Sequence, residues 1–174
     1  MESLTNSNAC MKCRGCCRFS QQDLGMSTII SKEELEKLGS TKLPAMRPHR
    51  GSKDVFQMEM MMSGNGGFVC PFLDEGTHKC GIYDSIPLDC RLWPFMIMRS
   101  KDGMKVNLVC AERWLCPSLE KISAQEFEGH KRQIMKMIRD EGIIARVANS
   151  PGLIWDYDQD AFIVEEIPEL KKSL

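Results

Sequence analysis

Apolar and polar residues alternate along this chain with two periods, and the change from one period to the other predicts its helices and strands. Over 123–142 the apolar residues recur at the helical spacing, and Ser123 with Glu126 forms a capping box at the start. The residues on the resulting stripe are Phe127, Ile134, Met137 and Ile138. This segment is predicted to be an amphipathic helix that Gly142 ends or loosens, with another turn or two before Pro151.

A shorter helix is predicted over 31–39. Ser31 and Glu34 form a capping box, and Gly39 stands where a helix-ending glycine is expected. Its inward-facing apolar residues are Leu35 and Leu38. The following segment, 41–54, is predicted to lack regular structure, because Pro44 and Pro48 interrupt it.

Period-two patterns and turn residues predict hairpins. "VFQMEMMM" (55–62) and "FVCPFL" (68–73) indicate two strands joined by the turn "SGNGG". A second hairpin is predicted within 94–110, turning at Asp102-Gly103. "AFIVEEI" (161–167) is typical of a last strand. The sequence therefore predicts a small α+β domain over 1–174, with an irregular cysteine-rich core, short β-hairpins and a C-terminal amphipathic helix.

Composition narrows the class of protein. The formal net charge is −1, so no broad basic surface for nucleic acid is expected. No apolar run approaches the roughly 18 residues that a membrane span needs. The N-terminus has neither a basic region nor an apolar region of the signal-peptide kind. We therefore expect a cytoplasmic protein.

The nine cysteines are the most unusual feature of the composition. In a reducing compartment, clustered cysteines bind metal or carry out redox chemistry more often than they form disulfides. Four of them form the run C-x2-C-x2-CC at Cys10, Cys13, Cys16 and Cys17. Bacterial ferredoxins begin their ligand run with the same C-x2-C-x2-C spacing and take another ligand from a Cys-Pro pair.

Two Cys-Pro pairs are available, at Cys70-Pro71 and Cys116-Pro117. Structural zinc sites usually draw their ligands from two close pairs, whereas the distal cysteines here are spaced singly. The spacing favours one or two 4Fe–4S clusters, with zinc as the alternative. The distal cysteines are Cys70, Cys80, Cys90, Cys110 and Cys116.

Six cations lie within three residues of a cysteine and would suit an anionic thiolate centre of either kind. The alternative is ordinary surface charge. They are Lys12, Arg14, Arg18, Lys79, Arg91 and Arg113.

The order of these segments resembles the CxxCxxCC cysteine-cluster family of zinc- or iron-chelating domains. The matching pieces are "CMKCRGCC", "CPFL", "CGIYDSIPLDCRLWPF" and "CP" at 116, so the resemblance covers a cysteine-cluster region at 10–117 and leaves 118–174 as a C-terminal helix and strand extension. It differs at Ile86-Pro87, where the family commonly has Arg-Pro. The family includes the flagellin lysine N-methylases, which are much longer.

The resemblance implies eight metal ligands, with Cys110 as the replacement for the last of them. They are Cys10, Cys13, Cys16, Cys17, Cys70, Cys80, Cys90 and Cys116.

Other candidate groups are weaker. His78 is either a ligand or a donor to the metal shell, or an exposed loop residue. Tyr83 and Asp84 either form hydrogen bonds at the cluster sulfurs or cap a turn, with packing as the alternative for Tyr83. The methionines and glycines of "MEMMMSGNGG" are expected to fill the core and form a turn, rather than bind copper or phosphate.

Three functions are consistent with the sequence. The favoured one is an iron–sulfur protein for redox chemistry or electron transfer, of the oxidoreductase type if it is an enzyme, with another redox protein as its partner. The second is an S-adenosylmethionine-dependent iron–sulfur methyltransferase. The third is a zinc-stabilised structural or adaptor protein.

Overall fold

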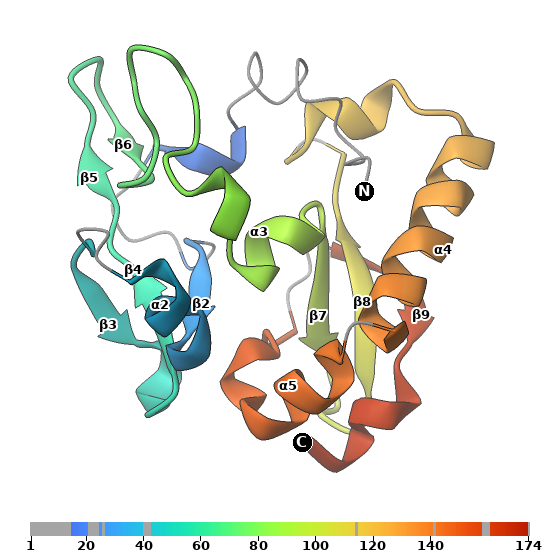
Figure 1. Cartoon of the computed structure of the whole chain (residues 1–174). Coiled ribbons are helices and arrows are strands. Elements are labelled where there is room, and N and C mark those ends of the chain that lie inside the picture. The colour runs from blue at the N-terminus through green and yellow to red at the C-terminus, as the bar shows by residue number, and fades with distance from the viewer. Residues whose placement is uncertain are drawn as a thin grey trace. The chain divides into compact units, whose positions relative to one another are not determined.

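The computed structural model describes residues 15–20, 25, 27–39, 43–113, 115–140, 142–157 and 161–173. The chain divides into two compact units, Met1–Arg91 and Leu92–Leu174 (Figure 1). Each unit combines helices with antiparallel strands, so the predicted α+β class is confirmed. The single-domain organisation stays a prediction.

The strands are β1 (Arg18–Phe19), β2 (Ile29–Ser31), β3 (Met46–Pro48), β4 (Val55–Met58), β5 (Met61–Met62), β6 (Phe68–Val69), β7 (Phe95–Arg99), β8 (Val106–Ala111) and β9 (Ala161–Glu166). The α-helices are α2 (Lys32–Leu38), α3 (Leu88–Leu92), α4 (Ala124–Asp140) and α5 (Ile143–Asn149). Short 3-10 helices include Gly15–Cys17, His49–Gly51, Tyr83–Ser85, Pro117–Glu120, Pro151–Leu153 and Pro168–Ser173.

The first unit contains two small antiparallel sheets, ordered β2-β4-β3 and β1-β6-β5. One hydrophobic cluster lies beneath them, and Cys70 and Cys80 pack against its edge. The buried members of this cluster are Ile30, Leu38, Met58, Met60, Phe72 and Ile82. The cluster thus supports both the strands and two of the candidate ligands.

Helix α2 begins and ends as its sequence predicts. The Ser31 hydroxyl accepts a hydrogen bond from the Glu34 amide, and the Glu34 carboxylate accepts one from the Ser31 amide at 2.9 Å. Gly39 ends the helix with a positive φ of 58°, a conformation that glycine adopts without steric cost. Leu38 is buried and Leu35 is half-buried, so both turn inward as predicted.

Two strand predictions in this unit were wrong in detail. Pro48 does not exclude regular structure, because it closes β3, an edge strand that pairs only with β4. The apolar segment 55–62 is not one strand, since β4 and β5 belong to different sheets. The predicted turn between β5 and β6 is confirmed, and Gly67 there has a φ of 72°, where a Cβ would lie 2.8 Å from the Phe19 carbonyl oxygen.

The second unit is built on the sheet β7-β8-β9. Strands β7 and β8 form the hairpin predicted at Asp102-Gly103, where Gly103 has a φ of 70°. The Asp102 carboxylate stabilises this turn by accepting hydrogen bonds from the Ser100 hydroxyl at 2.5 Å and the Met104 amide at 3.0 Å. Strand β9 pairs with β8 on its other side, as the terminal apolar segment predicts.

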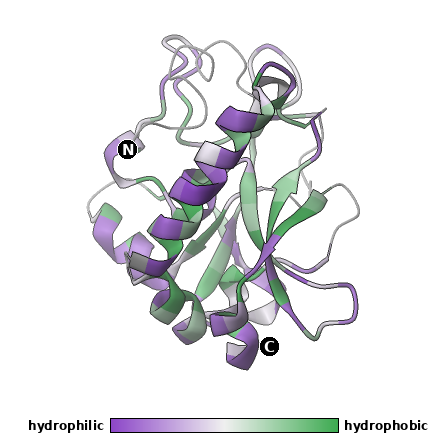
Figure 2. Ribbon diagram, turned by 90° about the vertical axis from the view of Figure 1, so that its right-hand side faces the viewer, coloured by the Kyte–Doolittle hydropathy of each residue, from purple (hydrophilic) through white to green (hydrophobic). Residues whose placement is uncertain are grey.

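Helix α4 covers one face of this sheet with its apolar stripe (Figure 2). The Phe127 ring lies 5.7 Å from Phe95 of β7 and 6.0 Å from Phe162 of β9, so one aromatic side chain bridges both strands. Gly142 has a φ of 68° and separates α4 from α5. Within the described residues, none of the helices combines the length and the apolar character that a membrane span requires.

Glu34 is expected to matter more for folding than any other residue of α2. Its buried carboxylate accepts hydrogen bonds from the Ser31 amide and hydroxyl and from the Leu88 amide at 2.6 Å. Glu34→Ala leaves these buried donors without that acceptor, so we expect the free energy of unfolding to fall by about 2–3 kcal/mol in urea denaturation.

The matched control is Glu36→Ala, because Glu36 lies on the exposed side of the same helix. It should change the free energy of unfolding by less than about 0.5 kcal/mol. Equal losses from both variants would contradict the role given to the buried carboxylate.

Candidate metal centre

Five cysteines from four segments of the chain lie in the first unit. Cys16 and Cys17 end the 3-10 helix Gly15–Cys17, and their sulfur atoms lie 3.9 Å apart. Cys70 follows β6, Cys80 lies in an isolated bridge, and Cys90 lies in α3. These segments are far apart in sequence, so their approach is a property of the tertiary structure.

A short antiparallel ladder joins the first two segments. Arg18 of β1 pairs with Val69 of β6, and the Cys70 amide donates to the Cys17 carbonyl at 2.9 Å. Because these hydrogen bonds link neighbouring backbones, the residues that bear the Cys17 and Cys70 thiols are held side by side.

A tight loop then returns the chain from Cys70 to Cys80. Leu73 and Cys80 form a bridge, and the Gly81 amide donates to the Phe72 carbonyl at 2.7 Å. At the tip of the loop, the Asp74 carboxylate accepts from the amides of Gly76 at 2.9 Å and Thr77 at 2.8 Å. These backbone donors lower the pKa of Asp74, so the carboxylate that closes the loop is charged at neutral pH.

Helix α3 is connected to the β2–α2 segment by two carboxylates. The Leu88 amide donates to Glu34 at 2.6 Å, and the Ile29 amide donates to Asp89 at 3.2 Å. Next to these contacts, the Thr28 hydroxyl lies 3.4 Å from the Cys90 sulfur. These contacts restrain Cys90 through the residues of α3 next to it and through its own sulfur atom. The sequence did not identify these contacts as part of the site.

The pKa values of four of these thiols are raised, and Cys16 contributes to the shifts of Cys70, Cys80 and Cys90. A hydrogen bond with Cys17, burial and the charge of Cys17 raise the pKa of Cys16. Burial raises the pKa of Cys70 to about 11, with smaller contributions from Cys80 and Cys16. Desolvation raises the pKa of Cys80, and the charge of Cys16 raises it further.

The Cys90 thiol belongs to the same region. Desolvation and the charge of Asp89 raise its pKa, Thr28 lowers it, and the charges of Cys70 and Cys16 raise it further. The residue is exposed, but its sulfur is directed toward buried Thr28. Without a cation, the charge of Cys16 therefore opposes ionisation of Cys70, Cys80 and Cys90, and a bound metal ion would offset that penalty.

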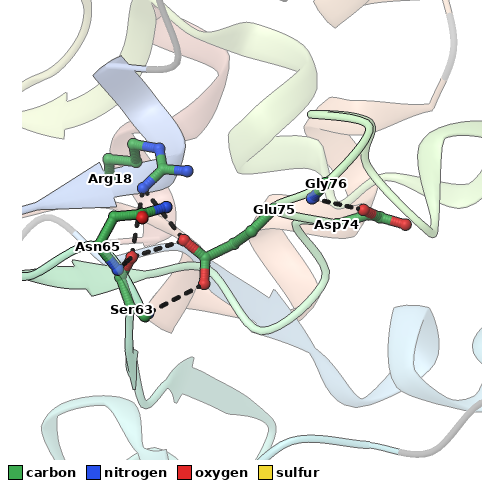
Figure 3. Close-up of polar contacts among 7 residues, drawn as sticks. Arg18, Ser63, Asn65, Asp74, Glu75 and Gly76 are labelled. Carbon is green, nitrogen blue, oxygen red and sulfur yellow. Dashed lines mark hydrogen bonds and ion pairs between the residues drawn. The ribbon is translucent and has the colours of Figure 1, made fainter.

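Arg18 forms an ion pair beside this region. Figure 3 shows its guanidinium directed at the Glu75 carboxylate, 3.2 Å away, and at the Ser63 hydroxyl at 3.4 Å. The Ser63 hydroxyl also donates to Glu75 at 2.5 Å, and this bond is the main cause of the lowered pKa of Glu75. Arg18 thus links the 74–80 loop to the β5–β6 turn. The Glu75 carboxylate neutralises much of the positive charge of Arg18.

The other candidate residues have different surroundings. Cys110 and Cys116 are buried in the second unit, where burial and the charge of Cys116 raise the pKa of Cys110 to about 12. Tyr83 is exposed, so packing does not explain it. Asp84 lies with Tyr83 in a 3-10 helix. His78 has a positive φ of 60° and a buried Nδ1 for which the described residues supply no hydrogen-bond partner.

A cavity of about 220 Å³ lies beside Cys80. It is lined by Lys37, Leu38, Cys80, Gly81, Ile82, Tyr83, Asp84 and Ser85.

Two of the predicted ligands, Cys10 and Cys13, and two of the predicted cations, Lys12 and Arg14, lie outside the described residues. Within the described ranges, no group of three or more histidine, cysteine or acidic side chains is close enough to hold a single metal ion. The chemistry of the donors, which are several thiols, fits a thiophilic metal such as zinc or iron.

The family model that matches the chain is described as "Putative zinc- or iron-chelating domain" and covers residues 9–111. This chain belongs to the CxxCxxCC family. The identification predicted from the cysteine spacing is thereby confirmed, and metal chelation is the activity that the family description supports. No curated protein and no solved structure gives a significant match.

The CxxCxxCC match bears on the eighth predicted ligand. The span 9–111 ends before Cys116 and contains Cys110, so the resemblance is found over a shorter segment than the predicted 10–117. The choice between Cys110 and Cys116 stays a prediction.

Metal binding by this CxxCxxCC protein is expected to release protons. Since burial raises the pKa of Cys70 to about 11 from the ordinary 9.0, this thiol is protonated at neutral pH and must lose its proton to become a ligand. Zn²⁺ should therefore bind more tightly at about pH 8 than at about pH 7, by about tenfold for each proton released.

Calorimetry in two buffers of different ionisation enthalpy measures the number of protons directly. Cys70→Ser supplies the comparison, because a serine hydroxyl does not ionise in this range and should release one proton fewer. Zinc binding without proton release would contradict the protonated state of the thiols.

Proposed function

We propose that this CxxCxxCC protein is an iron–sulfur protein that transfers electrons. The observation that carries the proposal is the presence of five cysteines from four segments in the first unit, where the Cys16 and Cys17 sulfur atoms lie 3.9 Å apart and the Cys70 amide donates to the Cys17 carbonyl. The sequence adds Cys10 and Cys13 to the same cysteine run, which makes seven thiols where a structural zinc site uses about four. The surplus favours clusters over one zinc ion.

The proposed ligands comprise these seven thiols and one more cysteine from further along the chain. Eight thiolates would hold two 4Fe–4S clusters, since each cluster takes about four. They are Cys10, Cys13, Cys16, Cys17, Cys70, Cys80, Cys90 and Cys116, with Cys110 as the alternative to Cys116.

A bound cluster supplies a reversible one-electron centre whose potential depends on burial, charge and hydrogen bonds to sulfur. The chain's own residues provide these influences. The hydrophobic cluster partly covers Cys70 and Cys80, whereas Cys16 and Cys90 are exposed. The side bearing Cys16 and Cys90 is therefore the proposed contact surface for a partner redox protein.

The cavity beside Cys80 does not favour the methyltransferase alternative. Its volume of about 220 Å³ is below the range of about 300–1,000 Å³ that is usual for small-molecule sites. This cavity alone would not enclose a cofactor as large as S-adenosylmethionine.

Metal analysis after anaerobic purification tests the proposal. We expect iron and acid-labile sulfide in equal amounts, at about four or about eight of each per chain, with visible absorption that dithionite bleaches. About eight would correspond to two clusters, and about four to one cluster. Zinc as the sole metal, in a colourless and air-stable protein, would overturn the proposal and leave the zinc-stabilised adaptor.

A pair of variants identifies the last ligand. Cys110 and Cys116 are both buried, so alanine is a better replacement than serine, whose hydroxyl would need a hydrogen bond. If Cys116 is a ligand, Cys116→Ala should lower the iron content while Cys110→Ala does not. The reverse result would assign Cys110, and no effect from either would exclude a ligand in the second unit.

A further inference from the structure

Thr28 presents a buried hydroxyl to one candidate ligand. Only 9% of the residue is exposed, and its Oγ1 lies 3.4 Å from the Cys90 sulfur, within hydrogen-bonding range for a sulfur acceptor. Burying a hydroxyl without a hydrogen-bond partner lowers the stability of the fold, so the partner that this hydroxyl has indicates its role. In the described part of the chain, the side-chain partner that the structure shows for this hydroxyl is Cys90.

The backbone around Thr28 holds this contact in place. The Thr28 carbonyl accepts a hydrogen bond from the Met58 amide at 3.0 Å, which fixes it beside β4. The next residue, Ile29, donates its amide to Asp89 at 3.2 Å. Consecutive residues of one segment therefore contact the consecutive residues Asp89 and Cys90 of α3.

Helix α3 is restrained independently of Thr28. Its first residue, Leu88, donates its amide to the buried Glu34 carboxylate at 2.6 Å. Because this carboxylate belongs to the capping box of α2, the position of α3 does not depend on the Thr28 hydroxyl. Removing that hydroxyl should leave the helix where it is and change only the surroundings of the Cys90 sulfur.

The direction of the hydrogen bond depends on the state of the sulfur. Between a thiol and a hydroxyl, either atom can be the donor. A metal-bound thiolate has no proton and can only accept, so the Thr28 hydroxyl must then donate. This bond would orient the sulfur and draw negative charge away from it.

We propose that Thr28 is a positioning residue of the metal centre, whose hydroxyl donates a hydrogen bond to the Cys90 sulfur when that sulfur ligates metal. The inference rests on the proposed function in one respect, the role of Cys90 as a ligand. It applies to a zinc site as well as to an iron–sulfur cluster, because both bind the thiolate.

Thr28→Val tests the proposal, since valine has nearly the same shape and lacks the hydroxyl. Cobalt(II), added to the metal-free protein, is the probe. We expect Thr28→Val to bind cobalt(II) about tenfold more weakly than the native chain. The sulfur-to-cobalt charge-transfer band should move to longer wavelength, because the sulfur keeps more negative charge.

Thr28→Ser keeps the hydroxyl and should restore both the affinity and the band position. Ser27→Ala is the matched control, because Ser27 is an adjacent buried residue for which the described structure shows no contact with a cysteine. Thr28→Ala, which cannot introduce a steric clash, replaces Thr28→Val if the valine variant fails to fold by circular dichroism.

Electrochemistry on iron-loaded protein gives a second measurement, the midpoint potential, which Thr28→Val would leave unchanged if Thr28 had only a structural role. Hydrogen bonds to sulfur stabilise the more negative, reduced state, so Thr28→Val should lower the midpoint potential and Thr28→Ser should not. If the native chain binds metal and Thr28→Val has the same affinity, band position and midpoint potential, the role of Thr28 is overturned and the proposed function stands. A native chain that binds neither cobalt(II) nor iron would overturn both.

Discussion

The backbone hydrogen bond from the Cys70 amide to the Cys17 carbonyl, 2.9 Å long, is the contact on which the candidate centre depends. It extends the β1–β6 pairing by one residue and joins the cysteine run to the middle of the chain. From Cys70, short segments of the chain lead to the other described thiols of the first unit. Cys80 follows through the Leu73–Cys80 bridge, and α3 places Cys90.

This arrangement assembles a site with little regular secondary structure. Strands β1, β5 and β6 have two residues each and cannot be stable alone. Three kinds of contact hold them: the hydrophobic cluster behind Cys70 and Cys80, the Arg18–Glu75–Ser63 network, and the carboxylates that fasten the loops. Metal binding would add a further restraint, since a metal that binds only the folded thiols stabilises the fold by its binding free energy.

Desolvation of the thiols and their mutual repulsion point to the same chemistry. A half-buried thiol with a pKa of about 11, as at Cys70, is a poor nucleophile at neutral pH, because little thiolate is present. The same thiol becomes a good ligand once a cation compensates for its charge. A metal centre therefore explains the clustering of Cys16, Cys70, Cys80 and Cys90 better than a thiol catalyst does.

The sequence alone determined those features that depend on neighbouring residues. The capping boxes at Ser31 and Ser123, the turn at Asp102-Gly103 and the stripe of α4 are local patterns, and each predicted its element correctly. The C-x2-C-x2-CC spacing likewise identified the family. Local patterns predicted the wrong structure where strand pairing determined it. Pairing with β4 makes Pro48 part of an edge strand, and Met58 and Met61 are separated because β4 and β5 belong to different sheets. Only the tertiary structure could bring Thr28, Ile29 and Glu34 to helix α3, since each of these contacts spans more than fifty residues and follows no periodic pattern.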